Sequence, residues 1–349
     1  MSLALIAMSG GVDSSVSAYL AVQVGYEAIG ATLKLFDSNQ QDACYGKTCC
    51  SEQDVLDAKS VCHKLGIPHY ILNYKEEFKK EVIDKFVDTY KNGGTPSPCI
   101  DCNRYIKFQK MLDFAKKMNC DRIVTGHYAI IEQKDNKYYL KKAKDASKDQ
   151  TYFLYFLNQE ILPYLEFPLG YTDKSITRKI AEEQGFRNSN KPDSQDICFI
   201  PDGNLSEFLA RYTCFTCGNF VDKDGNILGK HEGVEIYTIG QRKGLGISSA
   251  NPLYVNKKDK ADIILGSNED LFAKKLTAKN LNIICDDIPD DSKITAKIRS
   301  TGKDNECVFN RIDEDKFSLE FTESQRAIAK GQAVVLYDGE YCLGGGEIC

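Results

Sequence analysis

The chain has no long apolar run. None of its 349 residues belongs to a stretch that approaches the roughly 18 consecutive apolar residues of a membrane-spanning helix. No basic segment precedes the short apolar run at residues 3–8, so this run does not have the pattern of a signal peptide. We therefore expect a cytoplasmic protein that has no membrane partner.

An excess of positive charge is also absent. The formal net charge is −5 at pH 7, so a nucleic-acid surface would have to be a local basic patch on an acidic body. Arg242 and Lys243 form one short basic segment. A longer candidate patch, opposed by only two aspartates, consists of Lys134, Lys137, Lys141, Lys142, Lys144 and Lys148. Charge runs of this kind are more often a solvated face than a binding surface.

The glycine-rich turn near the N-terminus has neither the Walker A spacing nor the Gly-x-Gly-x-x-Gly spacing. An apolar run ends there in Ser9-Gly10-Gly11, and helix-compatible residues follow from 12 to 24. The pattern predicts a buried strand, a tight turn and a helix N-terminus. Glycines leave backbone N–H groups open to an anion, and a helix start adds further donors. We expect a phosphate site, with Ser9, Ser14 and Ser15 as hydroxyl donors and Asp13 holding a metal ion or orienting a donor.

Predicted strands alternate with predicted helices through the first 200 residues. The strands cover residues 27–35, 69–72 and 121–125, and the helices cover residues 51–65 and 76–90, with a third beginning near Asn103. This alternation predicts a parallel, doubly wound α/β sheet. A hairpin pattern follows at residues 132–140 and a helix at residues 172–184. Glycine-punctuated β patterns begin near residue 217. We expect three domains, at residues 1–212, 213–274 and 275–349, of which the last two are rich in β-structure.

Fourteen cysteines are many for a chain without an export signal. In a reducing compartment, clustered cysteines indicate metal, cluster or sulfur chemistry. Cys99 and Cys102 follow two prolines at a predicted helix start, where the helix dipole favours thiolates. Alone, this Cys-x-x-Cys fits a redox pair, half of a zinc site, two ligands of an iron–sulfur cluster or two ordinary thiols. Cys198 lies in a polar stretch that ends in apolar residues, as expected of a loop over an active site.

A second Cys-x-x-Cys is formed by Cys214 and Cys217. Together with Cys44, Cys49 and Cys50 it could supply zinc ligands. The spacing is unlike that of a zinc finger, and no histidine partner is evident. We therefore expect an incidental origin for these cysteines.

Seven motifs, in order along nearly the whole chain, resemble those of the tRNA-specific 2-thiouridylase family. They lie at residues 9–14 (SGGVDS), 95–103 (TPSPCIDCN), 106–108 (IKF), 125–129 (TGHYA), 148–150 (KDQ), 197–200 (ICFI) and 239–246 (IGQRKGLG). The first also resembles the pyrophosphate loop of the ATP-pyrophosphatase superfamily. The resemblance implies a nucleotide-binding α/β domain, a central β-rich domain and a C-terminal β-barrel-like domain.

The resemblance also implies an activity. The family thiolates C2 of the wobble uridine (U34) in Lys, Glu and Gln tRNAs, using ATP and Mg²⁺. The uridine oxygen is first adenylated, and sulfur then replaces AMP. The target base has to leave its stack to reach the enzyme, at a cost of roughly a few kcal/mol.

The resemblance assigns roles to individual residues of this chain. Catalytic roles fall to Cys102, Cys198 and Asp13. Adenine-nucleotide contacts fall to Ala7, Met8, Ser9, Gly10, Gly11, Val12, Asp13, Ser14, Leu33 and Gly126. Contacts with the target base or with tRNA fall to Ser97, Pro98, Cys99, His127, Lys148, Asp149, Gln150, Arg299, Ser300 and Gln332.

Two branches of the family deliver sulfur by different routes. In one branch an aspartate occupies the position of Cys99, and Cys102 works with a persulfide on Cys198. In the other branch, three cysteines hold a 4Fe–4S cluster whose fourth iron binds hydrosulfide. Cys99, Cys102 and Cys198 supply that three-thiolate set, so both routes stay open for this chain. The sulfur donor would be sulfide or a sulfur-relay protein.

Two other functions are compatible with parts of the sequence. The pyrophosphate loop would also suit an ATP-pyrophosphatase ligase with a non-tRNA acceptor, although the motifs after residue 94 argue against it. A non-catalytic RNA-binding protein with a cysteine-held metal is the other. Asp13→Ala separates these classes, because it should abolish thiolation and leave tRNA binding largely intact.

Overall fold

A computed structural model of the chain describes residues 2–36, 52–193, 196–200 and 203–349. Its N-terminal part is a five-stranded sheet in the order β3-β2-β1-β4-β7, and every ladder in it is parallel. The strands are β1 (Leu3–Ala7), β2 (Glu27–Lys34), β3 (His69–Asn73), β4 (Arg122–Val124) and β7 (Leu165–Glu166). The predicted parallel α/β sheet is confirmed.

Helices cover both faces of this sheet. One face packs against α1 (Val12–Gln23), α2 (Glu52–Lys64) and α7 (Lys174–Glu183) through Ala4, Ile6 and Val124. The other face packs through Leu5 and Ile123 against the helices between residues 75 and 117. The inward residues alternate along β1 as the period of a strand requires, which explains why an unbroken apolar run serves both faces.

The helices on this second face differ from the prediction in their details. The predicted helix at residues 76–90 is divided into α3 (Lys75–Phe78), a π-helical turn (Lys79–Asp84) and α4 (Lys85–Lys91). The helix expected near Asn103 begins five residues earlier. It runs as α5 (Pro98–Asp101), a π-helical turn (Cys102–Phe108) and α6 (Gln109–Lys117). Pro98 occupies the first turn, where its missing N–H costs no hydrogen bond. Cys99 and Cys102 are therefore helical residues.

The hairpin of β5 (Ile130–Lys134) and β6 (Lys137–Lys141) turns at Asp135 and Asn136, which both have positive φ. The hairpin was predicted, but its location was not. Strand β6 pairs with β17 at the other end of the chain, with Lys141 opposite Tyr341 and Leu140 opposite Cys342. The hairpin therefore extends the C-terminal sheet.

The C-terminal part is a six-stranded antiparallel barrel in the order β12-β15-β14-β13-β16-β17, closed by a ladder between β12 and β17. Its core includes Phe309, Phe317 and Phe321. The strands are β12 (Phe272–Ile283), β13 (Ser292–Lys297), β14 (Asn305–Arg311), β15 (Phe317–Arg326), β16 (Ala333–Asp338) and β17 (Tyr341–Ile348). The expected barrel-like fold is confirmed.

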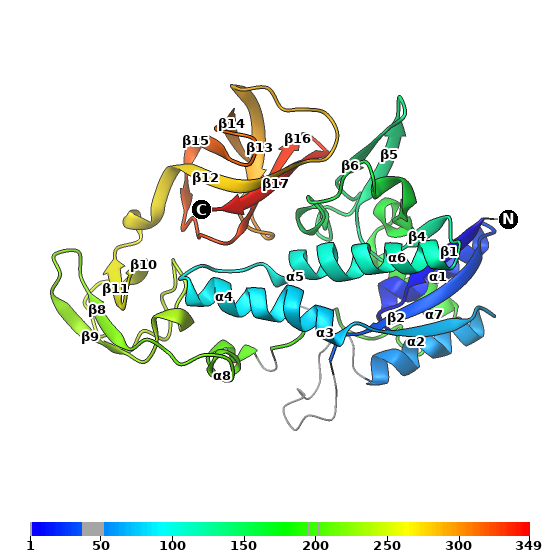
Figure 1. Cartoon of the computed structure of the whole chain (residues 1–349), viewed down its shortest axis with the longest axis horizontal. Coiled ribbons are helices and arrows are strands. Elements are labelled where there is room, and N and C mark those ends of the chain that lie inside the picture. Colours follow the sequence, from blue (N-terminus) through cyan, green and yellow to red (C-terminus); the bar gives the residue numbers. More distant parts are fainter. Residues whose placement is uncertain (1, 37–51, 194–195, 201–202) are drawn as a thin grey trace.

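In the sequence, a mixed four-stranded sheet in the order β10-β11-β8-β9 separates these two parts, and the short helix α8 (Leu205–Ala210) precedes it. Its strands are β8 (Gly218–Val221), β9 (Ile227–His231), β10 (Tyr254–Asp259) and β11 (Asp262–Gly266). Figure 1 shows this sheet and the barrel at the end of the molecule away from the N-terminal strands. The boundaries at residues 212 and 274 stay predictions. Within the described residues, no helix is long and apolar enough to cross a bilayer.

Candidate active site

The glycine turn joins β1 to α1. Gly10 has φ +73°, and a Cβ placed on it would lie 2.3 Å from the backbone oxygen of Asp54. No larger residue fits this turn without moving the start of α2. The hydroxyls of Ser14 and Ser15 each donate to the Gly11 carbonyl at 3.0 Å. Because α1 begins at Val12, its first N–H groups have no partner within the helix and face the turn. The predicted strand, turn and helix start are confirmed.

Two side chains from outside the predicted motif hold the turn. Asn188 donates from Nδ2 to the Gly10 carbonyl and to the Ser15 hydroxyl, both at 2.9 Å. Lys191 donates to the same carbonyl at 3.3 Å and forms ion pairs with Asp54 and Asp57 of α2. Burial alone would lower the pKa of Lys191, but the hydrogen bonds and charges of these two aspartates raise it. A permanent positive charge therefore lies beside the turn.

The Asp13 carboxylate is tied down on both oxygens. Lys174 Nζ lies 2.7 Å from one oxygen and 2.8 Å from the other, and the Tyr128 hydroxyl donates at 3.0 Å. The Thr177 hydroxyl lies 3.0 Å from the Tyr128 oxygen and donates to it, because the single phenol proton is used on Asp13. Burial and the nearby Asp13 charge raise the pKa of Tyr128, so its phenol stays a donor. A metal ion held by Asp13 would have to share this carboxylate with Lys174.

Lys174 connects the turn to the segment that leads to Cys198. Its Nζ lies 2.9 Å from Asp193, which also pairs with Lys148 and Arg178, each at 2.8 Å. Burial alone would raise the pKa of Asp193, but hydrogen bonds and charge from Lys148 and Lys174 hold it at about 2. Sequence inspection missed Lys174 and Asp193. The feature that marks Lys174 is its burial, since a lysine that is only 9% exposed is unusual. That burial becomes known only from the fold, so the sequence carried no signal for it.

The predicted adenosine contacts gather at the carboxyl edge of the parallel sheet. Ala7 ends β1, Met8 is buried directly after it, and Leu33 is buried near the end of β2. Gly126 follows β4, and a Cβ there would lie 2.8 Å from the Asp13 carbonyl carbon and from the Ser14 nitrogen. This edge is where open α/β sheets bind ligands. The structure brings these residues together, and their nucleotide contacts stay predictions.

His127 lies next to this edge, half-buried between the rings of Phe108 and Phe167 at centroid distances of 5.4 and 5.7 Å. Its Nδ1 is 2.8 Å from the Thr125 hydroxyl. Burial, with a smaller contribution from the charge of Lys107, lowers the pKa of His127 to about 3. The imidazole is therefore neutral at pH 7.

Asp149 and Gln150 are committed to internal hydrogen bonds. Asp149 accepts from the Ala143 N–H at 3.0 Å and from the Thr151 hydroxyl at 2.7 Å. Gln150 Oε1 accepts from the Tyr128 N–H at 2.9 Å. The hydrogen bonds of these two side chains stabilise the loop that carries Lys148. Their contacts with tRNA stay predictions. Such contacts would have to use side-chain atoms outside these hydrogen bonds, or the loop would have to rearrange.

The barrel holds the loop that precedes the cysteines. Gln332 donates from Nε2 to the carbonyls of Thr95 and Pro96, at 3.0 and 3.1 Å. The Thr95 N–H donates to the Lys330 carbonyl at 2.7 Å. Ser97 occupies the position before α5 and Pro98 is the first residue of α5, so the end of this loop is also the start of the cysteine-bearing helix.

The three predicted sulfur residues differ in exposure. Cys99 is exposed, Cys102 is 8% exposed, and Cys198 is half-buried. Cys102 and Cys198 contact the same hydrophobic cluster. Phe199 anchors the Cys198 segment there, with its ring 5.8 Å from that of Phe78 and 5.2 Å from that of Phe86.

No three His, Cys, Asp or Glu side chains within the described ranges form a group that could hold a metal ion. A cluster on Cys99, Cys102 and Cys198 would therefore need these side chains to regroup. Cys214 and Cys217 are exposed, and Cys217 Sγ donates to the Glu232 carbonyl at 3.3 Å. The other proposed zinc ligands, Cys44, Cys49 and Cys50, lie outside the described residues.

Most of the lysine patch around the hairpin is neutralised. Five of its six lysines pair with carboxylates, in the pairs Lys137–Asp286, Lys141–Glu132, Lys142–Asp304, Lys144–Asp173 and Lys148–Asp193. Such pairing weakens the field that would attract phosphates. Elsewhere on the barrel, Arg299 donates to the Ala327 carbonyl at 2.8 Å, and Ser300 is exposed. RNA contacts at these positions stay predictions.

The fold and the turn define a nucleotide-binding α/β protein with two β-modules, and three family models match it in that order. The tRNA methyl transferase HUP domain matches residues 3–202, the tRNA methyl transferase PRC-barrel domain matches residues 206–266, and the aminomethyltransferase beta-barrel domain matches residues 273–348.

Full-length relatives give the narrower assignment. The chain is 47% identical to the tRNA-specific 2-thiouridylase MnmA of Clostridioides difficile (strain 630), over 99% of this chain and 97% of that protein. It is 46% identical to MnmA 2 of Clostridium tetani (strain Massachusetts / E88) and 45% identical to MnmA of Clostridium kluyveri. Each of these two matches covers 99% of this chain and 98% of the relative. The chain belongs to the tRNA-specific 2-thiouridylase family, a family of enzymes.

Proposed function

We propose that this chain catalyses the ATP-dependent 2-thiolation of the wobble uridine (U34) of Lys, Glu and Gln tRNAs. The observation that carries the proposal is the turn at Gly10 and Gly11, whose N–H groups at the start of α1 suit a leaving pyrophosphate. The three relatives are themselves named tRNA-specific 2-thiouridylases. Family membership supports tRNA as the partner, and the turn supports ATP as the co-substrate.

The first step makes the uridine oxygen a good leaving group. The C2 oxygen attacks the α-phosphorus of ATP, a C–O–P linkage forms, and the bond from the α-phosphorus to the bridging oxygen breaks. The N3 proton of uridine leaves to solvent. Pyrophosphate departs toward the turn, where the first N–H groups of α1 stabilise its charge. Mg²⁺, which the family implies, would be held by Asp13 and would neutralise phosphate charge.

The second step replaces AMP by sulfur, and Cys102 and Cys198 are its central residues. On the persulfide route, the terminal sulfur on Cys198 adds to C2 and the C2–O bond breaks, so that AMP leaves. The Cys102 thiolate then attacks the Cys198 sulfur and breaks the S–S bond, which leaves sulfur on C2 and a Cys102–Cys198 disulfide. A dithiol reductant reopens that disulfide for the next turnover.

A 4Fe–4S cluster would be the alternative carrier. Cys99, Cys102 and Cys198 would hold it, and bound there it would supply an open iron for hydrosulfide. Cys99 distinguishes the two routes, because the persulfide pair does not use it.

The deciding experiment measures iron and acid-labile sulfide per chain in anaerobically purified protein, together with thiolation of tRNA. Thiolation is read as 2-thiouridine by mass spectrometry of digested nucleosides, with ATP and either sulfide or a persulfide donor. About four irons per chain, lost with the activity in Cys99→Ala, would establish the cluster. Iron-free protein that works with a persulfide donor and tolerates Cys99→Asp would establish the persulfide pair. Absence of 2-thiouridine with every donor, or ATP–pyrophosphate exchange that does not depend on tRNA, would contradict the proposed function.

A further inference from the structure

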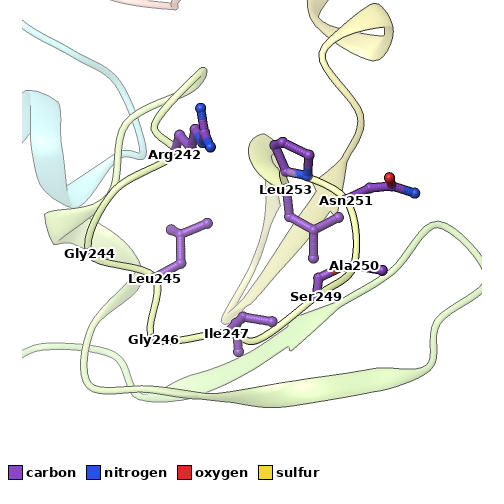
Figure 2. A pocket seen from close by; sticks show the side chains of 10 residues that line it. Arg242, Gly244, Leu245, Gly246, Ile247, Ser249, Ala250, Asn251 and Leu253 are labelled. Carbon is purple, nitrogen blue, oxygen red and sulfur yellow. The ribbon is translucent and has the colours of Figure 1, made fainter.

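The loop at residues 242–253 of the central module encloses a hollow of about 420 Å³. Figure 2 shows Leu245, Ile247 and Leu253 on its walls, with Arg242 at one side of the opening. Gly244 and Gly246 both have positive φ, at +78° and +68°, so the loop curls where larger residues would be strained. Gln241 donates from Nε2 to the Lys243 carbonyl at 3.0 Å. The loop therefore has a defined shape beneath its two cations.

The two cations at the start of this loop differ from the lysines of the hairpin. Arg242 and Lys243 are exposed, and within the described residues neither side chain forms a hydrogen bond or an ion pair. Five of the six hairpin lysines, in contrast, lie against carboxylates. A phosphate that approaches Arg242 and Lys243 does not have to displace an internal carboxylate. This loop, and not the hairpin, offers the more available positive charge.

The loop also contacts the part of the barrel near Arg299, which is a predicted tRNA contact. A Cβ on Gly240 would lie 2.8 Å from Ala327 Cβ, so the loop and the barrel turn touch at this point. The carbonyl of the same Ala327 accepts from Arg299 at 2.8 Å. Two hydrogen bonds with Val255, from Gly240 N–H at 2.8 Å and to the Gln241 carbonyl at 2.9 Å, hold the loop in this position.

We propose that Arg242 and Lys243 bind backbone phosphates of the tRNA, next to the region around Arg299. The hollow beside Arg242 gives the sugar of a bound nucleotide room against its aliphatic walls. The inference rests on the proposed function, because it assumes that tRNA is the partner. Charge that is not neutralised by the protein is what gives RNA binding its dependence on salt.

The test measures the affinity of the full chain for full-length tRNA at several KCl concentrations. We expect Arg242→Ala and Lys243→Ala each to lower the slope of log K against log salt by about one, and the double variant to lose roughly tenfold in affinity. Arg242→Lys should restore most of the slope. Both side chains are exposed, so circular dichroism and the melting temperature should not change.

Lys275→Ala is the matched control, because it removes one exposed cation that is already paired with Glu320 at 3.0 Å. It should leave both affinity and slope at the wild-type values. Loop variants that match this control would overturn the inference even while the wild-type chain binds and thiolates tRNA. A wild-type chain that neither binds nor thiolates tRNA would instead contradict the proposed function, so the two failures are distinguishable.

Discussion

The turn at residues 9–15 and the cysteine loop at residues 95–102 are built in different ways. The turn is held from within the α/β part, by Asn188 and Lys191 around Gly10 and by Lys174 on Asp13. The cysteine loop is held from outside, by Gln332 and by the backbone of Lys330 in the barrel. The residues proposed to bind ATP therefore all lie in the α/β part, whereas the loop that leads to Cys99 and Cys102 is also held by the barrel.

This difference follows the order of the proposed chemistry. Adenylation needs a preorganised site for leaving charge, and such sites gain from being rigid before the substrate arrives. Sulfur transfer needs access for a donor and a flipped base at the same place. The loop is held by three hydrogen bonds from the barrel, and its Cys99 stays exposed. We expect damage to the turn to stop both steps and damage to the loop to affect the second step selectively.

The largest expected effect is that of Asp13→Asn, which removes the charge that Lys174 neutralises and keeps the shape of the side chain. Both adenylation and thiolation should fall by about 10³-fold or more, since the leaving phosphate loses its ordered surroundings. ATP–pyrophosphate exchange in the presence of tRNA and 2-thiouridine formation are the two measurements. Asp88→Asn, at an exposed position of α4, is the control. A variant that loses only thiolation would break the proposed division.

Cys102→Ser should abolish 2-thiouridine formation and keep tRNA-dependent ATP–pyrophosphate exchange within about threefold of wild type. Serine keeps the shape of the buried side chain and removes the thiolate. Cys349→Ser, at an exposed cysteine, should leave both activities unchanged. Equal loss of the two activities in Cys102→Ser would show that the cysteine loop also serves adenylation.

Gln332→Ala removes the two side-chain hydrogen bonds from the barrel to the loop and leaves the one from the Thr95 N–H to the Lys330 carbonyl. We expect thiolation to fall by about 10- to 100-fold, because small misplacements of a catalytic group have effects of this size, while exchange changes little. Single-turnover thiolation of adenylated tRNA measures the step directly. Gln133→Ala, at an exposed position of β5, provides the matched amide loss. Unchanged thiolation in Gln332→Ala would mean that the Gln332 side chain does not position the loop.

The smallest expected effect is on the pH dependence of stability, through the imidazole of His127. The pKa of His127 is about 3 in the folded chain, and an unfolded histidine has a pKa of about 6.5. Between these values the unfolded chain binds a proton that the folded chain does not. The free energy of unfolding should therefore fall as the pH drops below about 6.5, by up to about 2 kcal/mol at pH 5. Urea denaturation of wild type and His127→Gln, compared at pH 7.5 and 5, tests this. Equal pH dependence in both would exclude His127 as the cause.

The elements that were predicted correctly are those determined by local pattern. The strand, glycine turn and helix at residues 3–23 follow from apolar periodicity and from glycine, and the hairpin turn follows from Asp135 and Asn136. The helix that begins at Pro98 was predicted to begin near Asn103, because proline both ends helices and begins them. Ordered motifs pointed to Asp13 and Cys102 as candidates.

The residues that hold those candidates in place could not be predicted from the sequence. Lys174 is 161 residues from Asp13, and Gln332 is more than 230 residues from the loop that it holds. No local pattern carries such pairings, because they arise only when the sheet edge and the barrel are placed together. The ion pairs of the lysine patch could not be predicted for the same reason, since carboxylates such as Asp286 and Asp304 come from distant segments.

The pairing of β6 with β17 has a consequence for any attempt to divide the chain. The two strands pair at Leu140–Cys342 and Lys141–Tyr341, so a truncation before the barrel would leave this end of β6 with unpaired N–H and C=O groups. Exposed strand edges of this kind recruit other chains and lead to aggregation. The N-terminal part should therefore be poorly soluble when it is produced alone, even though it contains every residue of the glycine turn.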